Sequence, residues 1–495
     1  MPIMDEPTSL DPQIADSNSE KLVAANCYEG LVRIMADGTI GKGVATDWNI
    51  SDDGLTYTFK LRNNSHWAMF SGHKAVLGEN YEDTFDITVK AEDFKFGIER
   101  TISEQTGSAD APLFSAVKSI STPDDFTIVF NLSYADDNFL YALTNPGAMP
   151  CDEEFFNLTN GKYGLDAKYL LCNGPFHVSK WTEKTSVKLA KNNEYNGESS
   201  VSPSSVTFYI NNDDSEVADK MNSVTYDVAF LSSSQFSSIE NKKDLNSVAV
   251  QNVTYSFIFN QNDNNYRNKN MRLAFCRSCD TSSLFDSQSD ISKADGIVPP
   301  SCKIGGEDYR NGNAAELLSY DETLAKKNFN DALLELGSSS VETTILCTEQ
   351  YEPFVKQMVQ KLQKTLGVKF VSTVKVVSES DLEAAVNDGN YSVAFYPFKA
   401  KSSFAGEIIE GFDQNNIFGY ESDVLSQKIR NIKNNSGSLE GERSAVADAE
   451  NYLVSEAVIM PVFYENSYFV TSKKTSGIYF YSSADNVCFI NAKKS

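Results

Sequence analysis

The stretch between residues 341 and 396 alternates between strand-like and helix-like patterns. Residues 341–347 resemble a strand. Residues 352–366 repeat apolar side chains at the spacing of an amphipathic helix, and Gly367 follows where the helix should end. Another strand, helix and strand are predicted at 368–377, 381–386 and 391–396. Because alternating strands and helices build parallel sheets covered by helices, this stretch predicts an α/β unit.

A shorter form of the same alternation occurs earlier in the chain. Residues 205–210 and 226–231 resemble strands, and residues 216–221 between them resemble a short helix. The last strand of each series has similar letters, Tyr-Asp-Val-Ala-Phe at 226–230 and Tyr-Ser-Val-Ala-Phe at 391–395. The two series predict two α/β units with mainly parallel sheets, and a cleft between two such units is a natural place to bind a ligand.

A different pattern precedes the first of these units. Residues 55–61 and 126–132 alternate apolar and polar side chains with the period of two that half-buried antiparallel strands show. Asp53 and Gly54 suit a hairpin turn, and residues 91–101 resemble a helix. We therefore expect a small α+β subdomain inserted into the first unit.

The bulk properties exclude several classes of protein. A chain of 495 residues exceeds one ordinary hydrophobic core and predicts two or three domains. The formal net charge of −25 argues against binding nucleic acid or an anionic lipid surface. The chain contains no run of 18 apolar residues, so no membrane-spanning helix is predicted. Residues 1–6 lack the basic and apolar regions of a signal peptide, so the protein is either cytoplasmic or shown here without its export segment.

Metal sites and catalytic motifs are not apparent. Among eight scattered cysteines only Cys276 and Cys279 are close in sequence, and the three histidines lie far from them, so we expect no metal and no cofactor. The cysteines permit disulfides, but their pairing cannot be read from the sequence. The chain has no Gly-x-Ser-x-Gly elbow, no His-Glu-x-x-His helix and no phosphate-binding Gly-Lys-Ser/Thr loop, which leaves a secreted hydrolase as a distant alternative.

Several short blocks occur in one order along the chain. The N-terminal blocks are Glu-Pro-Thr-Ser-Leu-Asp-Pro at 6–12, Tyr-Glu-Gly-Leu-Val at 28–32, Asp-Gly-Leu-Thr-Tyr-Thr-Phe-Lys-Leu-Arg at 53–62, Ala-Glu-Asp-Phe at 91–94 and Asn-Gly-Pro-Phe at 173–176. Later blocks lie at 257–260, 271–275, 296–300 and 459–464. In this order they resemble family 5 of the extracellular solute-binding proteins, the peptide and nickel receptors of ABC importers.

The resemblance implies a fold and a division of the chain. The fold is α/β, a two-lobed periplasmic-binding-protein-like fold of class II in its large three-part form, with an inserted α+β subdomain. Lobe I is expected from 1–44, 173–259 and 461–495, the inserted subdomain from 45–172, and lobe II from 260–460. The chain is then expected to cross between the lobes near Phe259 and Met460.

The resemblance also implies a function. It predicts an extracytoplasmic solute-binding protein, a monomer and not an enzyme, that binds a short peptide or a similar polar solute in the cleft between its lobes. The protein then hands the solute to a membrane permease of an ABC importer. It is expected in the periplasm or on the cell surface through a lipid anchor, with its export segment absent from this sequence.

One departure from the family bears on the ligand. Peptide-binding members carry an aspartate, in a Trp-x-x-Asp context after the strand matched here by 391–396, that pairs with the peptide ammonium. Here Phe398 stands where the aromatic residue does, and Lys401 where the aspartate does. A lysine repels an ammonium and attracts a carboxylate, so another acidic group, such as Asp16 or Glu465, would have to replace the aspartate. The alternative is a receptor for a nickel-metallophore or another anionic solute.

These considerations predict a set of ligand-binding residues. In the family the segment after residues 10–12 offers its main chain to an extended peptide, which is a sequence-independent mode of recognition. Phe398 is expected as an apolar wall and Lys401 as a selector of anions, and the residues after the return crossing are the next candidates. The full set is Asp16, Ser17, Asn18, Phe398, Lys401, Tyr464 and Glu465.

Overall fold

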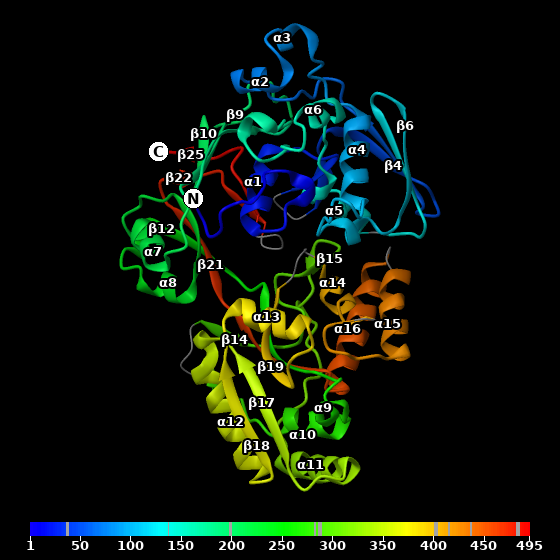
Figure 1. Ribbon diagram of the computed structural model, residues 1–495, viewed down its shortest axis with the longest axis vertical. Helices are drawn as coiled ribbons and strands as arrows, with labels where there is room; N and C mark the ends of the chain where they lie inside the picture. Colours follow the sequence, from blue (N-terminus) through cyan, green and yellow to red (C-terminus); the bar gives the residue numbers. More distant parts are fainter. Residues whose placement is uncertain are drawn as a thin grey trace. The chain divides into compact units, whose positions relative to one another are not determined.

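The structure is a computed structural model of the chain (Figure 1). It describes residues 1–35, 39–136, 138–197, 200–281, 284–285, 290–399, 404–413, 416–435, 438–481 and 486–495. The chain forms two compact units, which we call unit 1 (Met1–Val248 with Tyr468–Ser495) and unit 2 (Ala249–Ser467). Unit 2 is one continuous stretch, whereas unit 1 is built from both ends of the chain.

A six-stranded sheet forms the centre of unit 2. Its strands, in spatial order, are β14 (Ile291–Lys293), β20 (Ile459–Glu465), β13 (Val253–Phe259), β19 (Val393–Lys399), β17 (Val341–Cys347) and β18 (Phe370–Val376). β17 runs parallel to β18 and β19, and β13 runs antiparallel to β19 and β20. The strands β17, β18, β19 and β20 therefore point in the same direction. We call the end of the sheet where these four strands finish, and where β13 begins, the carboxyl end.

Helices cover both faces of this sheet. On β13 the buried side chains alternate between the faces, with Phe257 and Phe259 in one core and Ile258 in the other. The first core includes side chains of α10 (Lys269–Arg277), α11 (Glu322–Leu336) and α12 (Glu352–Leu366). The second core includes side chains of α13 (Glu379–Asn387), α14 (Ala405–Glu410), α15 (Asp423–Asn434) and α16 (Leu439–Ser455). Figure 1 shows α12 on one side of β17 and β19 and α16 on the other.

The α/β unit predicted from residues 341–396 is confirmed. The strand β17 and the helix α12 have the predicted limits, and β18, α13 and β19 follow within a few residues of their expected positions. The apolar stripe of α12, which includes Val355, Met358 and Leu362, is buried. Gly367 caps the helix with a φ of 79°, a backbone conformation that favours glycine.

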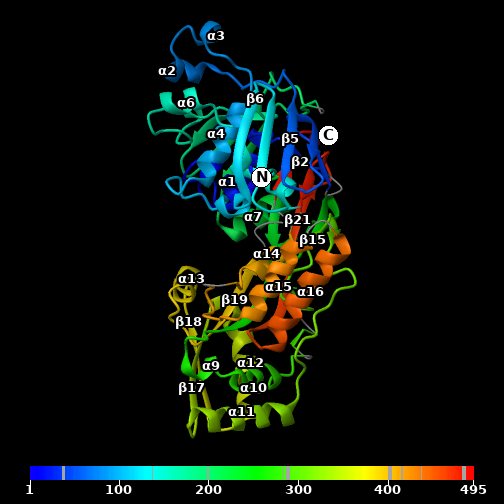
Figure 2. The same ribbon diagram turned by 90° about the vertical axis from the view of Figure 1, so that its right-hand side faces the viewer.

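Unit 1 contains an antiparallel sheet with a helix against it. The strands are β4 (Ala45–Ile50), β5 (Thr56–Leu61), β7 (Thr127–Leu132) and β6 (Val117–Asp124), in that order, and α4 (Ala91–Ile102) packs on β6 and β7 (Figure 2). Gly54, with a φ of 69°, lies in the turn that joins β4 to β5. The antiparallel strands, the hairpin turn and the helix expected here are confirmed, and the limits 45–172 for a separate subdomain stay a prediction.

The rest of unit 1 joins distant parts of the chain. One sheet has the order β1 (Pro2–Ile3), β10 (Ser205–Ile210), β9 (Ser186–Lys191) and β8 (Phe176–Thr182), and another has the order β11 (Val228–Ser232), β21 (Ser467–Ser472) and β12 (Leu245–Val250). Two-stranded sheets pair β2 (Val32–Ile34) with β3 (Ile40–Lys42), β22 (Thr475–Ser476) with β25 (Lys493–Lys494), and β23 (Tyr479–Tyr481) with β24 (Asn486–Cys488). The main helices are α1 (Asn18–Cys27), α7 (Asp214–Asn222) and α8 (Ser233–Ser238).

The two strands of the first predicted α/β unit do not share a sheet. The strands β10 and β11 and the helix α7 exist near their predicted positions, but β10 and β11 belong to different sheets. β10 pairs antiparallel with β9, and β11 pairs instead with β21, which comes from the C-terminal part of the chain. β10 also pairs parallel with β1, from the start of the chain. Local sequence patterns carry no information on such distant partners, so the prediction that these two strands belong to one α/β unit was wrong.

The two crossings between the units lie close to Phe259 and Met460, but not at them. Phe259 and Met460 both lie inside strands of the six-stranded sheet, β13 and β20. The chain passes between the units at Val248–Ala249, before β13 begins, and at Ser467–Tyr468, after β20 ends. Both crossings therefore connect to unit 2 at the carboxyl end of its sheet.

Candidate functional site at the carboxyl end of unit 2

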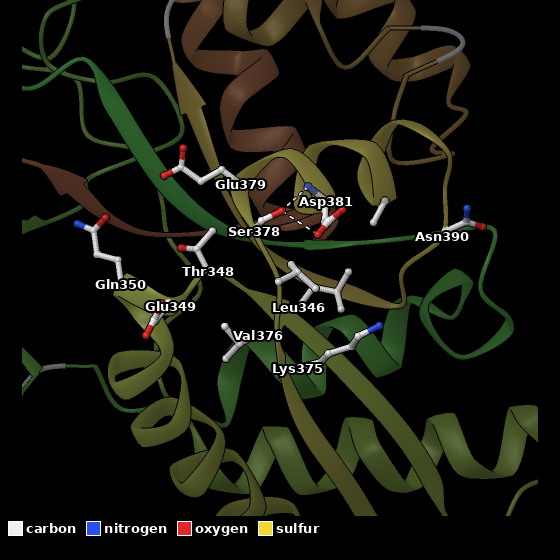
Figure 3. A pocket seen from close by; sticks show the side chains of 12 residues that line it. Leu346, Thr348, Glu349, Gln350, Lys375, Val376, Ser378, Glu379, Asp381 and Asn390 are labelled. Carbon is white, nitrogen blue, oxygen red and sulfur yellow. Dashed lines mark hydrogen bonds between the residues drawn. The ribbon is translucent and has the colours of Figure 1, made fainter. Parts of the chain in front are cut away.

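A pocket of about 840 Å³ lies where β17 and β18 end (Figure 3). In α/β proteins, ligands bind beyond the carboxyl ends of parallel strands, because loops and helix N-termini converge there. The lining follows this rule: Thr348, Glu349 and Gln350 come directly after β17, and Val377 and Ser378 directly after β18. The pocket is thus built by the predicted α/β unit.

The lining of the pocket is more acidic than basic. Glu349, Glu379 and Asp381 line it, against one cation, Lys375, among the described residues. Ser378 caps α13: its Oγ accepts a hydrogen bond from the main-chain nitrogen of Asp381 (3.1 Å) and donates to the Asp381 carboxylate (2.8 Å; Figure 3). The Asp381 carboxylate at the start of α13 is therefore held in place, and the acidic pocket suits a ligand that carries positive charge.

Glu465, the last residue of β20, is half-buried at the same end of the sheet. The hydroxyl of Tyr351 donates a hydrogen bond of 2.6 Å to its carboxylate. Burial raises the pKa of the Glu465 carboxyl, and the charge of Glu379 raises it further, whereas the Tyr351 hydrogen bond and the Lys399 ammonium lower it. Since Glu379 also lines the pocket, the two carboxylates share one electrostatic environment that a bound cation would stabilise.

Aromatic packing fixes the position of Tyr351. Its ring lies 4.4 Å from that of Tyr255 and 5.4 Å from that of Phe463, measured between centroids. Burial raises the pKa of the Tyr351 hydroxyl, so this group stays protonated and serves as a hydrogen-bond donor. The donor to Glu465 is thus held rigidly by the core of unit 2 rather than by a mobile loop.

Phe398 is half-buried on β19. Its ring stacks on Phe412 and Phe418, at 5.8 Å from each, and it packs against the second core of unit 2. Much of its surface is therefore used inside the unit. Lys401 lies outside the described residues.

Tyr464 lies in the interior of unit 2, with 3% of its surface exposed. Its hydroxyl accepts a hydrogen bond of 3.1 Å from the main-chain nitrogen of Asp295 and lies 3.4 Å from the carbonyl oxygens of Gly296 and Val298. Burial raises the pKa of this hydroxyl to about 12. These contacts connect β20 to the 295–298 turn, which is a structural role.

The residues predicted from unit 1 lie at the start of α1. Ser17 caps this helix, and Asp16 and Asn18 are exposed beside it. The Glu20 carboxylate accepts hydrogen bonds from the main-chain nitrogens of Asp16 (3.0 Å) and Ser17 (3.1 Å), and from that of Thr8 (2.7 Å). The main-chain nitrogens of Asp16 and Ser17, which we expected to bind a peptide, are therefore already hydrogen-bonded within unit 1.

Three residues of the carboxyl end were not predicted from the sequence: Tyr255, Tyr351 and Glu379. Tyr351 directly precedes the predicted helix 352–366, and Glu379 precedes the predicted helix 381–386 by two residues. The rule that ligands bind beyond the carboxyl ends of parallel strands pointed to both positions. Tyr255 lies on β13, which pairs with β19 and β20. Only the register of the sheet brings Tyr255 close to Tyr351.

Two general features complete the description of the site. No group of three or more histidine, cysteine, aspartate or glutamate side chains in the described part of the chain is arranged to hold a metal ion. Within the same described ranges, no helix combines the length and the apolar character needed to cross a membrane.

The fold is that of the two-lobed extracytoplasmic binding proteins. Residues 39–418 match the family model described as "Bacterial extracellular solute-binding proteins, family 5 Middle". The chain belongs to this family, as the ordered blocks in its sequence predicted. The family consists of proteins that bind solutes outside the cytoplasm.

Curated relatives align over nearly the whole chain. The dipeptide-binding protein DppE of Bacillus subtilis is 24% identical over 496 residues, covering 96% of this chain and 88% of its own length. The probable D,D-dipeptide-binding periplasmic protein DdpA of Escherichia coli is 22% identical and covers 98% of this chain and 92% of its own length.

Solved structures show the same fold over the full chain. OppA of Listeria monocytogenes bound to peptide has a TM-score of 0.77 and 21% identity, and covers 100% of this chain and 98% of its own. The dipeptide-binding protein of Pseudoalteromonas sp. SM9913 in complex with Met-Leu has a TM-score of 0.78 and 18% identity, with coverages of 100% and 99%. The predicted family and two-lobed α/β fold are thus confirmed.

Proposed function

We propose that this protein binds short peptides outside the cytoplasm and delivers them to the permease of an ABC importer. Its family binds extracellular solutes, and relatives that align over almost its whole length are named for dipeptides. The proposal includes a monomeric state. It also includes a location either in the periplasm or at the cell surface through a lipid anchor. A nickel-metallophore receptor is the less favoured alternative, because the relatives compared above are peptide-binding proteins.

The observation that carries the proposal is the half-buried carboxylate of Glu465. By the resemblance to the family, Lys401 stands where peptide-binding members carry the aspartate that pairs with the peptide ammonium. Glu465 supplies a carboxylate at the carboxyl end of the sheet, positioned by Tyr351 at 2.6 Å and close to the charge of Glu379. A cation that binds there relieves the repulsion between the two carboxylates, so we assign Glu465 as the partner of the peptide N-terminus.

The test compares free and blocked peptides. Isothermal titration calorimetry is carried out with a series of dipeptides to pentapeptides and with their N-acetylated forms, using the parent and the Glu465→Gln variant. Because an ammonium–carboxylate pair that is removed from water is strong, Glu465→Gln should weaken binding of free peptides by about 2 kcal/mol or more. The acetylated peptides should bind the parent and the variant equally weakly.

A matched control comes from the opposite end of the same sheet. Glu342 is exposed near the start of β17, so Glu342→Gln changes the net charge equally without changing the carboxyl end. It should bind every peptide as the parent does. The assignment of Glu465 is refuted if Glu465→Gln binds free peptides as tightly as Glu342→Gln. The proposal of peptide binding itself is refuted if no peptide in the series binds the parent.

A further inference from the structure

Two buried cysteines of unit 1 lie far apart in sequence and next to each other in space. Cys27 is the last residue of α1, and Cys172 lies shortly before β8. Cys27 has 0% and Cys172 has 2% of its surface exposed. Burial raises the pKa of the Cys27 thiol, and the neighbouring Cys172 side chain raises it further. Both thiols are therefore shielded from other reagents, and main-chain contacts bring their two segments together.

The main chain fixes this approach independently of the thiols. The nitrogen of Gly174 donates a hydrogen bond of 2.9 Å to the carbonyl oxygen of Cys27. A Cβ atom on Gly174 would lie 2.7 Å from the carbonyl carbon of Cys27, so only glycine permits the backbones to come this close. A disulfide requires its two Cα atoms to lie within about 7 Å. The main-chain contact between Cys27 and Gly174, two residues after Cys172, is the kind of close approach that a disulfide needs.

The side chain of Asn173 strengthens the junction. Its Oδ1 accepts a hydrogen bond of 3.0 Å from the main-chain nitrogen of Glu29, and its Nδ2 donates one of 2.8 Å to the Glu29 carbonyl oxygen. The two segments are thus joined by three hydrogen bonds, one between Cys27 and Gly174 and two between Glu29 and Asn173. Other cysteines have different partners: Cys151 accepts from Arg100 at 3.5 Å, and Cys279 donates to a main-chain oxygen.

We propose that Cys27 and Cys172 form a disulfide bond once the protein has left the cytoplasm, an inference that rests on the extracytoplasmic location in the proposed function. Disulfides persist in oxidising compartments and are rare where thiols are kept reduced. The bond would connect the end of α1 to the segment before β8 and close a loop that contains the whole antiparallel sheet β4–β7.

The reaction is a thiol–disulfide exchange with an external disulfide, either a protein oxidant or oxidised glutathione. One cysteine thiolate attacks this disulfide, forms a mixed disulfide and displaces one thiol of the oxidant. The second cysteine thiolate then attacks the mixed disulfide, which forms the Cys27–Cys172 bond and releases the second thiol. The protein loses two protons and two electrons, and the oxidant gains them as two thiols.

Burial determines when this reaction can occur. In the folded protein, burial raises the pKa of the Cys27 thiol well above its usual value, so little reactive thiolate is present. The exchange should therefore proceed during folding, before the junction closes, and slowly in protein that has already folded in the reduced form. A comparison of refolding with treatment of the folded protein reveals this order.

The test detects the bond directly. The full chain is unfolded, reduced and refolded in a glutathione redox buffer, then alkylated under denaturing conditions, digested and analysed by mass spectrometry. We expect two of the eight cysteines to escape alkylation and a cross-linked peptide pair that contains Cys27 and Cys172. Closure of so long a loop should raise the thermal midpoint of unit 1 by about 10 °C over the reduced protein.

Variants separate the bond from general effects of losing a thiol. Cys27→Ser and Cys172→Ser should each abolish the cross-linked peptide and make the thermal midpoint insensitive to reductant. Cys302→Ser, at a buried thiol of unit 2, should retain both the cross-link and the sensitivity. If either serine variant fails to fold, the mass spectrum of the parent protein still decides the question.

Two results would overturn the inference: eight alkylated cysteines after oxidative refolding, or a cross-link that joins Cys27 or Cys172 to another cysteine. Neither result depends on the ligand. A cross-linked protein that binds no peptide in the series contradicts the proposed function and leaves the disulfide intact. A protein that binds peptides but lacks the cross-link contradicts the disulfide alone.

Discussion

A buried ion pair in unit 2 should control the stability of that unit. Glu450 lies on α16 with 1% of its surface exposed, and its carboxylate forms an ion pair with Arg310. One carboxylate oxygen accepts from the main-chain nitrogens of Ile297 (2.7 Å) and Val298 (3.0 Å), and the other accepts from the Tyr309 hydroxyl (3.0 Å). One side chain thus satisfies donors from a turn, a tyrosine and an arginine.

The substitution Glu450→Gln keeps the shape of this side chain and removes its charge. The glutamine NH₂ group replaces one accepting oxygen, so either the nitrogens of Ile297 and Val298 or the hydroxyl of Tyr309 lose their acceptor. The buried Arg310 also loses its counter-charge. Removal of one partner of a buried pair costs about 3–5 kcal/mol. For a unit of this size each kcal/mol corresponds to about 2–4 °C, and we expect the thermal midpoint of unit 2 to fall by about 10 °C.

Differential scanning calorimetry of the full chain measures this change, with Asp448→Asn as the control on the same helix. Asp448 is 59% exposed and pairs with Lys428 at 2.5 Å, and a surface pair of this kind contributes about 1 kcal/mol or less. The control should therefore shift the midpoint by only a few degrees. Equal shifts for the two variants would show that the Glu450 network does not stabilise unit 2 as argued.

Two further predictions concern pH and charge selection. Burial lowers the pKa of His73 to about 4, so the unfolded chain takes up the proton first as the pH falls. Above about pH 6.5 the buried, neutral His73 does not reduce the free energy of unfolding, and at pH 5 the free energy of unfolding is lower by roughly 2 kcal/mol. Thermal midpoints measured across this pH range should therefore change less steeply in His73→Gln. If Lys401 selects an anionic group of the ligand, Lys401→Ala should weaken that ligand by roughly 2 kcal/mol; calorimetry showing unchanged binding for both Lys401→Ala and Lys401→Glu would make it a surface residue.

The sequence predicted the fold best where neighbouring elements pair with each other. β17, α12 and β18 follow one another in sequence, and β17 pairs with β18, so local periodicity was enough to predict this part of the sheet. The same reasoning failed for β11, because its partner β21 lies more than two hundred residues further along the chain.

The candidate site shows the same limit at the level of single residues. The sequence places both Tyr464 and Glu465 just after the expected return crossing, but adjacent residues on a strand point to opposite faces. Tyr464 therefore lies in the core, while Glu465 receives the Tyr351 hydrogen bond at the carboxyl end. That contact depends on a residue more than a hundred positions away, which no local pattern indicates.

The return of the chain to unit 1 has a consequence for biosynthesis. β21 is the central strand of its sheet, and the Asn26 side chain bonds to the main chain of Val487 (2.8 Å) and Phe489 (3.2 Å). The ribosome makes the first 248 residues early, yet they lack these partners until the final segment emerges. The middle of the chain can complete its own core first, which reverses the usual order in which N-terminal domains fold during translation.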